Sequence, residues 1–262
     1  MTIRRGRRVA EILAASTRYL RDQDVPDARV DAELLLVHVL KSSLVDVLAN
    51  SDLELTQPQI RAFNRAIARR GSREPVAYIT GVKEFYGLPF KVTPSVLIPR
   101  PETEILVERA IALKPRTVLD IGTGSGAIAG ALAAALPHAK ITATDVSEAA
   151  LGIAKQNLPA RVVLKKGRDF EPVKGETFDL VVSNPPYIPT REIDKLQAEV
   201  KREPFVALDG GRDGLDIVRR ILKGAKKALV EIGIGQAAVL RSEFPGVRFH
   251  KDLAGIERVV EL

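Results

Sequence analysis

The stretch Thr117-Val118-Leu119-Asp120-Ile121-Gly122-Thr123-Gly124-Ser125-Gly126 decides the predicted fold. Its first five residues are largely apolar and predict a buried β-strand, and the glycines that follow predict a tight loop. Residues 127–136 are rich in Ala and Leu and are followed by Pro137, which is typical of a helix and its end. A strand, a glycine-rich loop and a helix in this order form the first nucleotide-binding unit of a doubly wound α/β fold.

The glycine spacing and two acidic residues indicate which ligand this unit binds. The loop has the pattern G-x-G-x-G, whereas dinucleotide-binding proteins use G-x-G-x-x-G. Asp120 at the strand end would repel a phosphate but suits a positively charged ammonium group. The next predicted strand, residues 140–144, ends in Asp145, which can accept hydrogen bonds from ribose hydroxyls, and Ser147 is expected to cap a helix that runs to about residue 157. The pattern therefore favours S-adenosylmethionine over NAD, bound by a loop made of Gly122, Thr123, Gly124, Ser125 and Gly126.

A second informative segment, Ser183-Asn184-Pro185-Pro186-Tyr187, follows a predicted buried strand at residues 180–182. Two consecutive prolines extend neither a β-ladder nor a helix, so they hold the backbone rigid and leave its carbonyls available. The Asn184 side chain adds one acceptor and two donors. At the carboxyl end of a strand, these groups suit the binding of a planar amide or amine through its N–H bonds. A proline-rich turn with no function is the alternative, and the upstream glycine loop weakens it.

Several further segments share a likeness to one family, over roughly residues 27–262. They lie at residues 73–81, 85–87, 97–104, 196–200, 203–204, 207–215 and 231–233. With these segments the chain resembles the HemK/PrmC family, protein-(glutamine-N5) methyltransferases that act on peptide chain release factors. Asn-Pro-Pro-Tyr alone is shared with DNA adenine and RNA guanine methyltransferases, whereas Pro-Arg-Pro-Glu-Thr-Glu and Gly-Gly-Arg-Asp-Gly are far more particular to this family.

The resemblance implies an α/β fold, with a class I methyltransferase Rossmann-like doubly wound sheet and an N-terminal helical bundle. It implies three parts: a substrate-recognition bundle at residues 1–81, a linking β-hairpin at 82–97 and a methyltransferase domain at 98–262. The expected reaction moves a methyl group from S-adenosylmethionine to the glutamine amide nitrogen of a Gly-Gly-Gln motif, leaves S-adenosylhomocysteine and needs no metal. The Asn184 oxygen and the Pro185 carbonyl would each accept one amide N–H, Pro186 would hold the loop rigid, and Tyr187 would pack on the amide. Asn184 is also expected to touch the cofactor.

The chain departs from the family at Gly167-Arg168-Asp169-Phe170. The family usually has an acid, an aromatic and a Phe here, which border the adenine, whereas ungapped counting puts Arg168 at the acid and Asp169 at the aromatic. We expect Asp169 to accept a hydrogen bond from the adenine amino group, with Phe170 as an apolar wall. The alternative is that Asp169 only caps a turn.

The first part of the chain predicts helices without a catalytic constellation. Asp27 is expected to cap a helix that carries Val30 and Leu34, and Pro58 falls in the first turn of another helix. These helices predict a bundle, which either holds the protein substrate or only stabilises the fold. The pairs Arg69-Arg70 and Arg219-Arg220 lie in predicted helices and are expected to point outward.

Composition narrows the remaining possibilities. The chain of 262 residues has 45% hydrophobic residues and no cysteine, which excludes disulfides and thiolate metal sites. Its three histidines are scattered without ligand spacing, and no stretch reaches the roughly 20 apolar residues of a membrane span. The arginines at positions 4, 5, 7 and 8 precede no apolar segment, so we expect no secretory signal and a cytoplasmic protein without a membrane partner.

The net charge of +7 would permit attraction to RNA, but the basic residues are spread along the chain and no aromatics alternate with them. We therefore expect no stable nucleic-acid partner. The predicted partner is a peptide chain release factor. The alternatives are glutamine methylation of a ribosomal protein or amino-group methylation of a nucleic-acid base, and a ligand-binding module without catalysis is favoured least.

Overall fold

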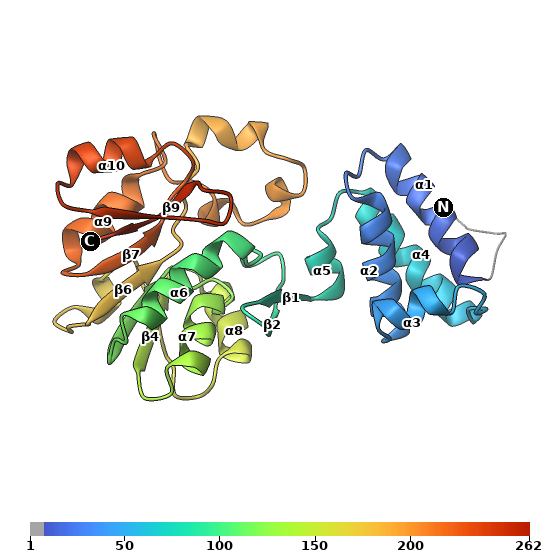
Figure 1. The fold of residues 1–262 in the computed structure, drawn as a ribbon, viewed down its shortest axis with the longest axis horizontal. Coiled ribbons are helices and arrows are strands. Elements are labelled where there is room, and N and C mark those ends of the chain that lie inside the picture. Colours follow the sequence, from blue (N-terminus) through green and yellow to red (C-terminus); the bar gives the residue numbers. More distant parts are fainter. Residues whose placement is uncertain (1–7) are drawn as a thin grey trace. The chain divides into compact units, whose positions relative to one another are not determined.

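The computed structural model describes residues 8–262, so the N-terminal arginines up to Arg7 lie outside the described residues. The chain divides into two compact units (Figure 1). Unit 1 comprises Met1–Gly81 together with Ala198–Arg202, and unit 2 comprises Val82–Gln197 and Glu203–Leu262. The inclusion of Ala198–Arg202 in unit 1 is a feature that the sequence did not suggest.

Unit 1 is built from short helices around one apolar core. Ile12, Leu35 and Phe63 are fully buried in this core and come from three different helices. Helix α4 begins with a capping box, in which the Thr56 hydroxyl accepts from the Gln59 backbone N–H and the Gln59 side chain accepts from the Thr56 N–H. The helices are α1 (Val9–Asp22), α2 (Ala28–Leu40), α3 (Leu44–Ala49), α4 (Gln57–Gly71) and α5 (Val76–Thr80).

Arg70 corrects one expectation from the sequence, because this side chain points inward. It is buried, and its Nε donates to Asp31 Oδ2 over 2.6 Å while its Nη2 donates to Glu199 Oε1 over 2.9 Å. Arg73 also binds Glu199, through Nε and Nη2, each at 2.7 Å. Buried charges need such partners, so these arginines bind Ala198–Arg202 to unit 1.

The predicted helix after Asp27 is present, with Asp27 at its N-cap position but without a side-chain capping hydrogen bond. Val30 and Leu34 on this helix are 53% and 42% exposed, while Leu35 and Leu36 are fully buried. The exposed apolar side chains continue on α3, where Val45 is 75% exposed. Unit 1 therefore presents apolar surface on α2 and α3.

Unit 2 begins with a β-hairpin and continues into a seven-stranded sheet. The hairpin pairs β1 (Val82–Phe85) with β2 (Leu88–Lys91), and both strands lie within residues 82–97. The sheet contains β3 (Thr117–Ile121), β4 (Lys140–Asp145), β5 (Val163–Lys166), β6 (Leu180–Ser183), β7 (Ala228–Glu231), β8 (Arg248–Lys251) and β9 (Glu257–Glu261). Its helices are α6 (Glu104–Ala112), α7 (Ala127–Ala135), α8 (Glu148–Asn157), α9 (Asp216–Gly224) and α10 (Ala237–Glu243).

The strand order is β5-β4-β3-β6-β7-β9-β8, with all pairs from β5 to β7 parallel and the pairs of β9 antiparallel. After β3 the chain adds β4 and β5 on one side, and β6 then returns to the other side of β3. The order of the strands therefore reverses between β3 and β6. In an open α/β sheet, ligands bind at the carboxyl ends of the strands beside such a switch point.

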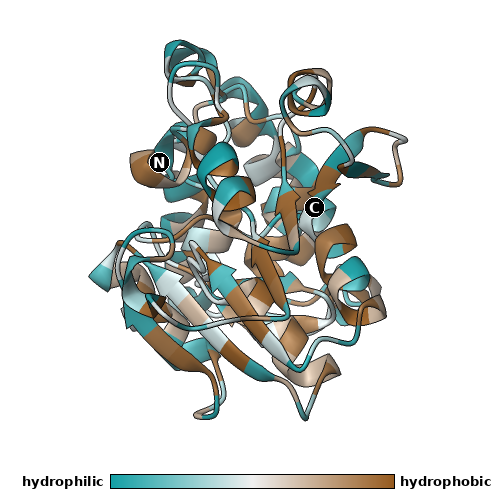
Figure 2. Ribbon diagram, turned by 90° about the vertical axis from the view of Figure 1, so that its left-hand side faces the viewer, coloured by the Kyte–Doolittle hydropathy of each residue, from teal (hydrophilic) through white to brown (hydrophobic). Residues whose placement is uncertain are grey.

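Alternating side chains along β3 face two separate apolar cores. Val118 packs with residues of α6 and α7 such as Leu132, whereas Leu119 packs with residues of α9 and α10 such as Val218. Figure 2 shows hydrophobic residues, in brown, along the strands of the sheet. Burial on both faces explains why β3 and β6 are continuous apolar runs, the signal that the sequence offered. Within residues 8–262, the structure contains no helix with both the length and the apolar character needed to cross a bilayer.

Candidate active site

Unit 2 contains a cavity of about 460 Å³ at the carboxyl ends of β3, β4 and β6. This volume is in the range of small-molecule binding sites. Most of the predicted site residues line the cavity, while Asp120, Gly126, Phe170 and Tyr187 do not. The lining includes the predicted residues Gly122, Thr123, Gly124, Ser125, Asp145, Asp169, Asn184, Pro185 and Pro186.

The glycine loop is shaped by backbone hydrogen bonds to the neighbouring strand. The N–H groups of Gly122 and Thr123 both donate to the Thr144 carbonyl, each over 2.9 Å. Gly124 has φ +56°, a conformation that favours glycine, and its N–H donates to Asp145 Oδ2 over 2.9 Å. No described heavy atom lies within 4 Å of the place that a Cβ of Gly124 would take. The main chain of the loop is therefore open to a ligand.

Asp120 lies behind the loop and reaches the cavity through Thr123. Its side chain is fully buried, Oδ2 accepts a hydrogen bond from Thr123 Oγ1 at 2.6 Å, and Oδ1 has no partner among the described residues. Burial raises the pKa of Asp120 to about 7, and the nearby charge of Asp145 adds to this effect. The Thr123 hydroxyl donates to Asp120, so its oxygen can accept from a ligand in the cavity.

Asp145 joins the glycine loop to helix α8. Its Oδ1 accepts from the Ser147 N–H over 2.8 Å, while Oδ2 accepts from Gly124. Burial raises the pKa of Asp145, and these backbone N–H groups act in the opposite direction. Ser147 caps α8 as predicted, through its hydroxyl and the Ala150 N–H. Each carboxylate oxygen of Asp145 keeps a second lone pair that can accept from a ligand hydroxyl.

The segment after β5 differs from the expectation. Asp169 lines the cavity in a left-handed conformation, φ +47°, and its Oδ2 accepts from Arg220 Nε over 2.6 Å. Phe170 does not line the cavity. Its ring packs so tightly on Gly224 that a Cβ at that position would lie 2.4 Å from it. Phe170 is therefore not among the residues that line the cavity, whereas Arg220, whose side chain is 45% exposed as expected, does line it.

Asn184 occupies the switch point, directly after β6. Its Nδ2 donates to Thr103 Oγ1 over 3.0 Å, whereas its Oδ1 is shielded from solvent and has no partner among the described residues. A buried acceptor without a donor costs about 1–3 kcal/mol, which a bound N–H group would offset. The arrangement leaves one amide oxygen unsatisfied in a residue that lines the cavity.

Tyr187 lies on the other side of this loop. Its hydroxyl donates to Glu231 Oε1 over 3.4 Å, and its ring edge lies 3.3 Å from the position of a Cβ at Gly233. Burial raises the pKa of Tyr187, and the charge of Glu231 adds to this rise. In the structure, the Tyr187 ring therefore packs against Gly233. The apolar walls of the cavity are provided instead by residues such as Phe85 and Phe205.

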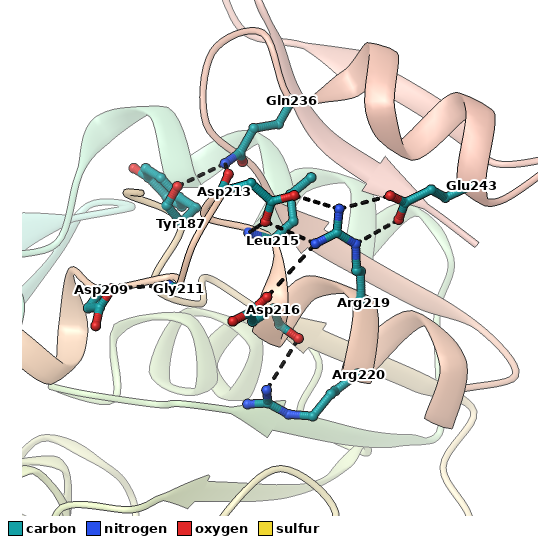
Figure 3. Close-up of polar contacts among 10 residues, drawn as sticks. All are labelled: Tyr187, Asp209, Gly211, Asp213, Leu215, Asp216, Arg219, Arg220, Gln236 and Glu243. Atoms are coloured by element: carbon teal, nitrogen blue, oxygen red, sulfur yellow. Dashed lines mark hydrogen bonds and ion pairs between the residues drawn. The ribbon is translucent and has the colours of Figure 1, made fainter. Parts of the chain in front are cut away.

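The segment 209–216 packs against the backbone of Tyr187, and Gln236 binds both (Figure 3). The Gln236 side-chain amide donates to the carbonyls of Tyr187 and Asp213, at 2.9 and 3.3 Å. A Cβ on Gly214 would lie 2.2 Å from the Tyr187 carbonyl oxygen, so only glycine fits there. Arg219 fixes the segment by binding Asp213 and Glu243, with hydrogen bonds of 2.7–2.9 Å. The Arg219 side chain is 23% exposed, and its ion pairs with Asp213 and Glu243 lie at the surface.

Two buried residues at the site, Thr103 and Glu231, were not singled out in the sequence. Thr103 lines the cavity and is 3% exposed, and Glu231 at the end of β7 is 1% exposed. Burial raises the pKa of Glu231 to about 7. Both residues lie in segments that carried the family likeness, and the position of Glu231 at a strand end was the one local signal available.

The described residues fit S-adenosylmethionine. The open main chain of the glycine loop, the acceptors of Asp145 and the buried Asp120 behind Thr123 suit a ligand that has ribose hydroxyls and an ammonium group. Among residues 8–262 there is no group of three or more His, Cys, Asp or Glu side chains arranged to hold a metal ion.

Two known protein families match parts of the chain. The family description "PrmC N-terminal domain" matches residues 11–81, and "Methyltransferase small domain" matches residues 101–245. The catalytic domain of hMettl16, solved in complex with an RNA hairpin, has a TM-score of 0.54 at 20% identity and covers 79% of this chain and 81% of that chain. At this identity the likeness concerns the fold alone.

Protein relatives are much more similar. A release factor glutamine methyltransferase of Geobacter sulfurreducens is 44% identical over 96% of this chain and 95% of that protein. Those of Koribacter versatilis and Moorella thermoacetica are 41% and 42% identical, and the matches cover 94% and 88% of this chain and 95% and 87% of those proteins. Identity at this level over nearly the whole length places the sequence, with its glycine loop and Asn-Pro-Pro-Tyr segment, in the release factor glutamine methyltransferase family.

Proposed function

We propose that the chain transfers the methyl group of S-adenosylmethionine to the side-chain amide nitrogen of the glutamine in the Gly-Gly-Gln motif of a peptide chain release factor. The observation that carries the proposal is the Asn184 amide oxygen, a buried acceptor without a partner among the described residues, in a residue that lines the same cavity as the glycine loop. The names of the relatives supply the substrate class. We place the reaction in the cytoplasm, where release factors act.

On the cofactor side, Asp145 would accept from the ribose hydroxyls, and Thr123, polarised by Asp120, would accept from the methionine ammonium. The main chain of the Gly122–Gly126 loop would face the ligand. Gly126 itself does not line the cavity and contributes through packing. Its Cβ position is 3.0 Å from Leu158, so it lets α7 begin close to that side chain. When bound, S-adenosylmethionine supplies an electrophilic methyl group on a positively charged sulfur.

On the substrate side, the Asn184 oxygen and the Pro185 carbonyl would each accept one N–H of the glutamine amide. An amide nitrogen is a poor nucleophile because its lone pair is delocalised into the carbonyl. Two acceptors on its N–H bonds increase the electron density on nitrogen and fix its direction, which is a positioning effect. The surplus proton can leave after the methyl transfer, so no strong base is required at Asn184. Phe85 and Phe205 would help to exclude water.

Unit 1 would hold the release factor. Its exposed apolar side chains on α2 and α3, among them Leu34 and Val45, offer a surface for a protein partner. The segment Ala198–Arg202 is bound by Arg70 and Arg73 and is continuous in sequence with Glu203, which pairs with Arg100 in unit 2.

The test is transfer of labelled methyl groups from S-adenosylmethionine to defined substrates. A release factor should be labelled, and the same factor with its motif glutamine replaced by glutamate should not. Labelling of a ribosomal protein or of a DNA or RNA substrate, with the release factor left unlabelled, would overturn the proposal.

A further inference from the structure

The Asn184 side chain can present either its oxygen or its nitrogen to the cavity, and the reaction needs the oxygen. A half-turn of the amide about its last bond exchanges an acceptor for two donors at nearly the same place. Only the acceptor can bind an N–H of the substrate. Some feature of the protein must therefore favour one orientation over the other.

Thr103 is the neighbour that distinguishes the two orientations. It stands at the N-cap position of α6, where a threonine hydroxyl usually accepts from a backbone N–H, but it makes no capping hydrogen bond. Its Oγ1 instead accepts from Asn184 Nδ2 over 3.0 Å. A hydroxyl has a single hydrogen, so it binds the nitrogen side of Asn184 whenever that hydrogen is donated elsewhere.

Glu231, a buried carboxyl at the end of the neighbouring strand β7, is the acceptor to which we assign this hydrogen. The parallel register pairs Ser183 with Val230. Asn184 and Glu231 are the next residues along their chains, so they occupy matching positions at the ends of β6 and β7. Burial raises the pKa of Glu231, and a hydrogen bond from Thr103 would oppose that rise. The carboxylate is short of donors, because Tyr187 reaches Oε1 only at 3.4 Å and Oε2 has no partner among residues 8–262. It can therefore accept the hydrogen of Thr103.

We propose that Thr103 and Glu231 are positioning residues that orient the Asn184 amide, so that its oxygen and not its nitrogen faces the substrate. Glu231 orders the Thr103 hydroxyl, and the hydroxyl oxygen then holds Asn184 Nδ2. The inference rests on the proposed role of Asn184 as the acceptor for the glutamine amide.

Kinetics of Thr103→Val at pH 8 test the proposal, because this change removes the hydroxyl and keeps the shape of the side chain. We expect kcat to fall by about tenfold or more, since the amide is no longer held in one orientation. The affinity for S-adenosylhomocysteine should change by less than about threefold, and Thr103→Ser should restore most of the rate, since it restores the acceptor. Thr142→Val is the matched control, because Thr142 is also buried but lies on β4 outside the cavity lining.

Glu231→Gln provides a second, independent arm. The amide of glutamine can donate as well as accept, so it no longer dictates the direction of the Thr103 hydroxyl. We expect kcat to fall while the thermal stability is kept or increased. The substitution removes a buried charge, whose pKa is raised by burial, and keeps the size of the side chain. A residue that only supported the fold would lose stability and rate together.

The outcomes separate the positioning role from the proposed function. If Asn184→Ala abolishes turnover while Thr103→Val and Glu231→Gln both keep normal kcat, the acceptor role stands and the positioning role is wrong. If Asn184→Ala itself turns over normally, the acceptor role fails first. If Thr103→Ser is as slow as Thr103→Val, the hydroxyl is not what matters and the inference is overturned.

Discussion

Replacing Gly214 by alanine should displace the Asn184–Tyr187 loop, because no space exists for a methyl group at this position. The Cβ would lie 2.2 Å from the Tyr187 carbonyl oxygen and 2.6 Å from Gln236 Nε2. The first of these atoms is backbone and cannot rotate away. Gly214 also has φ +81°, a conformation that is strained for alanine.

The cost can be divided with a matched control. Gly235 has nearly the same backbone conformation, φ +83°, but no described atom lies within 4 Å of its Cβ position. Gly235→Ala should therefore cost only the left-handed strain, about 1–2 kcal/mol. Gly214→Ala should cost that amount plus about 1–3 kcal/mol for the forced shift of the loop. The difference between the two variants measures how tightly segment 209–216 holds the catalytic loop.

The assay combines thermal unfolding with steady-state methylation of a release factor. We expect Gly235→Ala to keep a near-normal kcat and Gly214→Ala to lose about tenfold or more, because small displacements of a positioning group are costly. The affinity for S-adenosylhomocysteine should be similar in both, since the Gly122 loop is not disturbed. If the two variants match in both stability and kcat, the contact of Gly214 with the Tyr187 carbonyl does not position the loop and the reasoning is refuted.

Three further predictions concern the cofactor side and unit 1. Asp145→Ala should weaken S-adenosylhomocysteine binding in calorimetry by about 1–3 kcal/mol, and unchanged affinity would exclude its ribose contact. The pKa of Asp120 is raised to about 7, so this carboxyl becomes neutral below that pH. The affinity for the cofactor should then fall by up to about tenfold from pH 8 to pH 6. Asp120→Asn should flatten this pH dependence. Burial opposes the charge of Glu199, but the hydrogen bonds from Arg73 and Arg70 outweigh it and lower its pKa to about 2. Because the folded-state pKa of Glu199 is depressed, the stability that it contributes is present above about pH 4.5 and lost towards pH 2. Glu199→Gln should therefore lower the free energy of unfolding by about 1–3 kcal/mol at pH 7. An acid unfolding curve that this variant leaves unaltered would contradict the pairing.

Local patterns predicted the part of the fold that forms the cofactor cavity. β3, the glycine loop and α7 are contiguous in sequence, and the Ser147 cap and the end of α7 before Pro137 depend on neighbouring residues only. Asp145 and Asn184 follow apolar strands, and parallel strands bring such ends together. These features could be predicted because each needs only a short stretch of chain.

The remaining features depend on partners that are far apart in sequence. Arg70 is buried because Asp31 and Glu199 meet it from 39 and 129 residues away. Thr103 contacts Asn184 across 81 residues, and neither segment has a local pattern that indicates this contact. Phe170 was expected as an apolar wall beside the adenine, but its ring packs against Gly224, and Arg220 pairs with Asp169. Side-chain partners of this kind are decided by packing and not by local sequence.

The most direct test of the central claim is mass spectrometry of a release factor incubated with the protein and isotopically labelled S-adenosylmethionine. The labelled methyl group should appear on the side-chain nitrogen of the glutamine in the Gly-Gly-Gln peptide, in the presence of wild-type protein and not of Asn184→Ala. A methyl group on another residue of the release factor, or equal labelling by Asn184→Ala, would contradict the account.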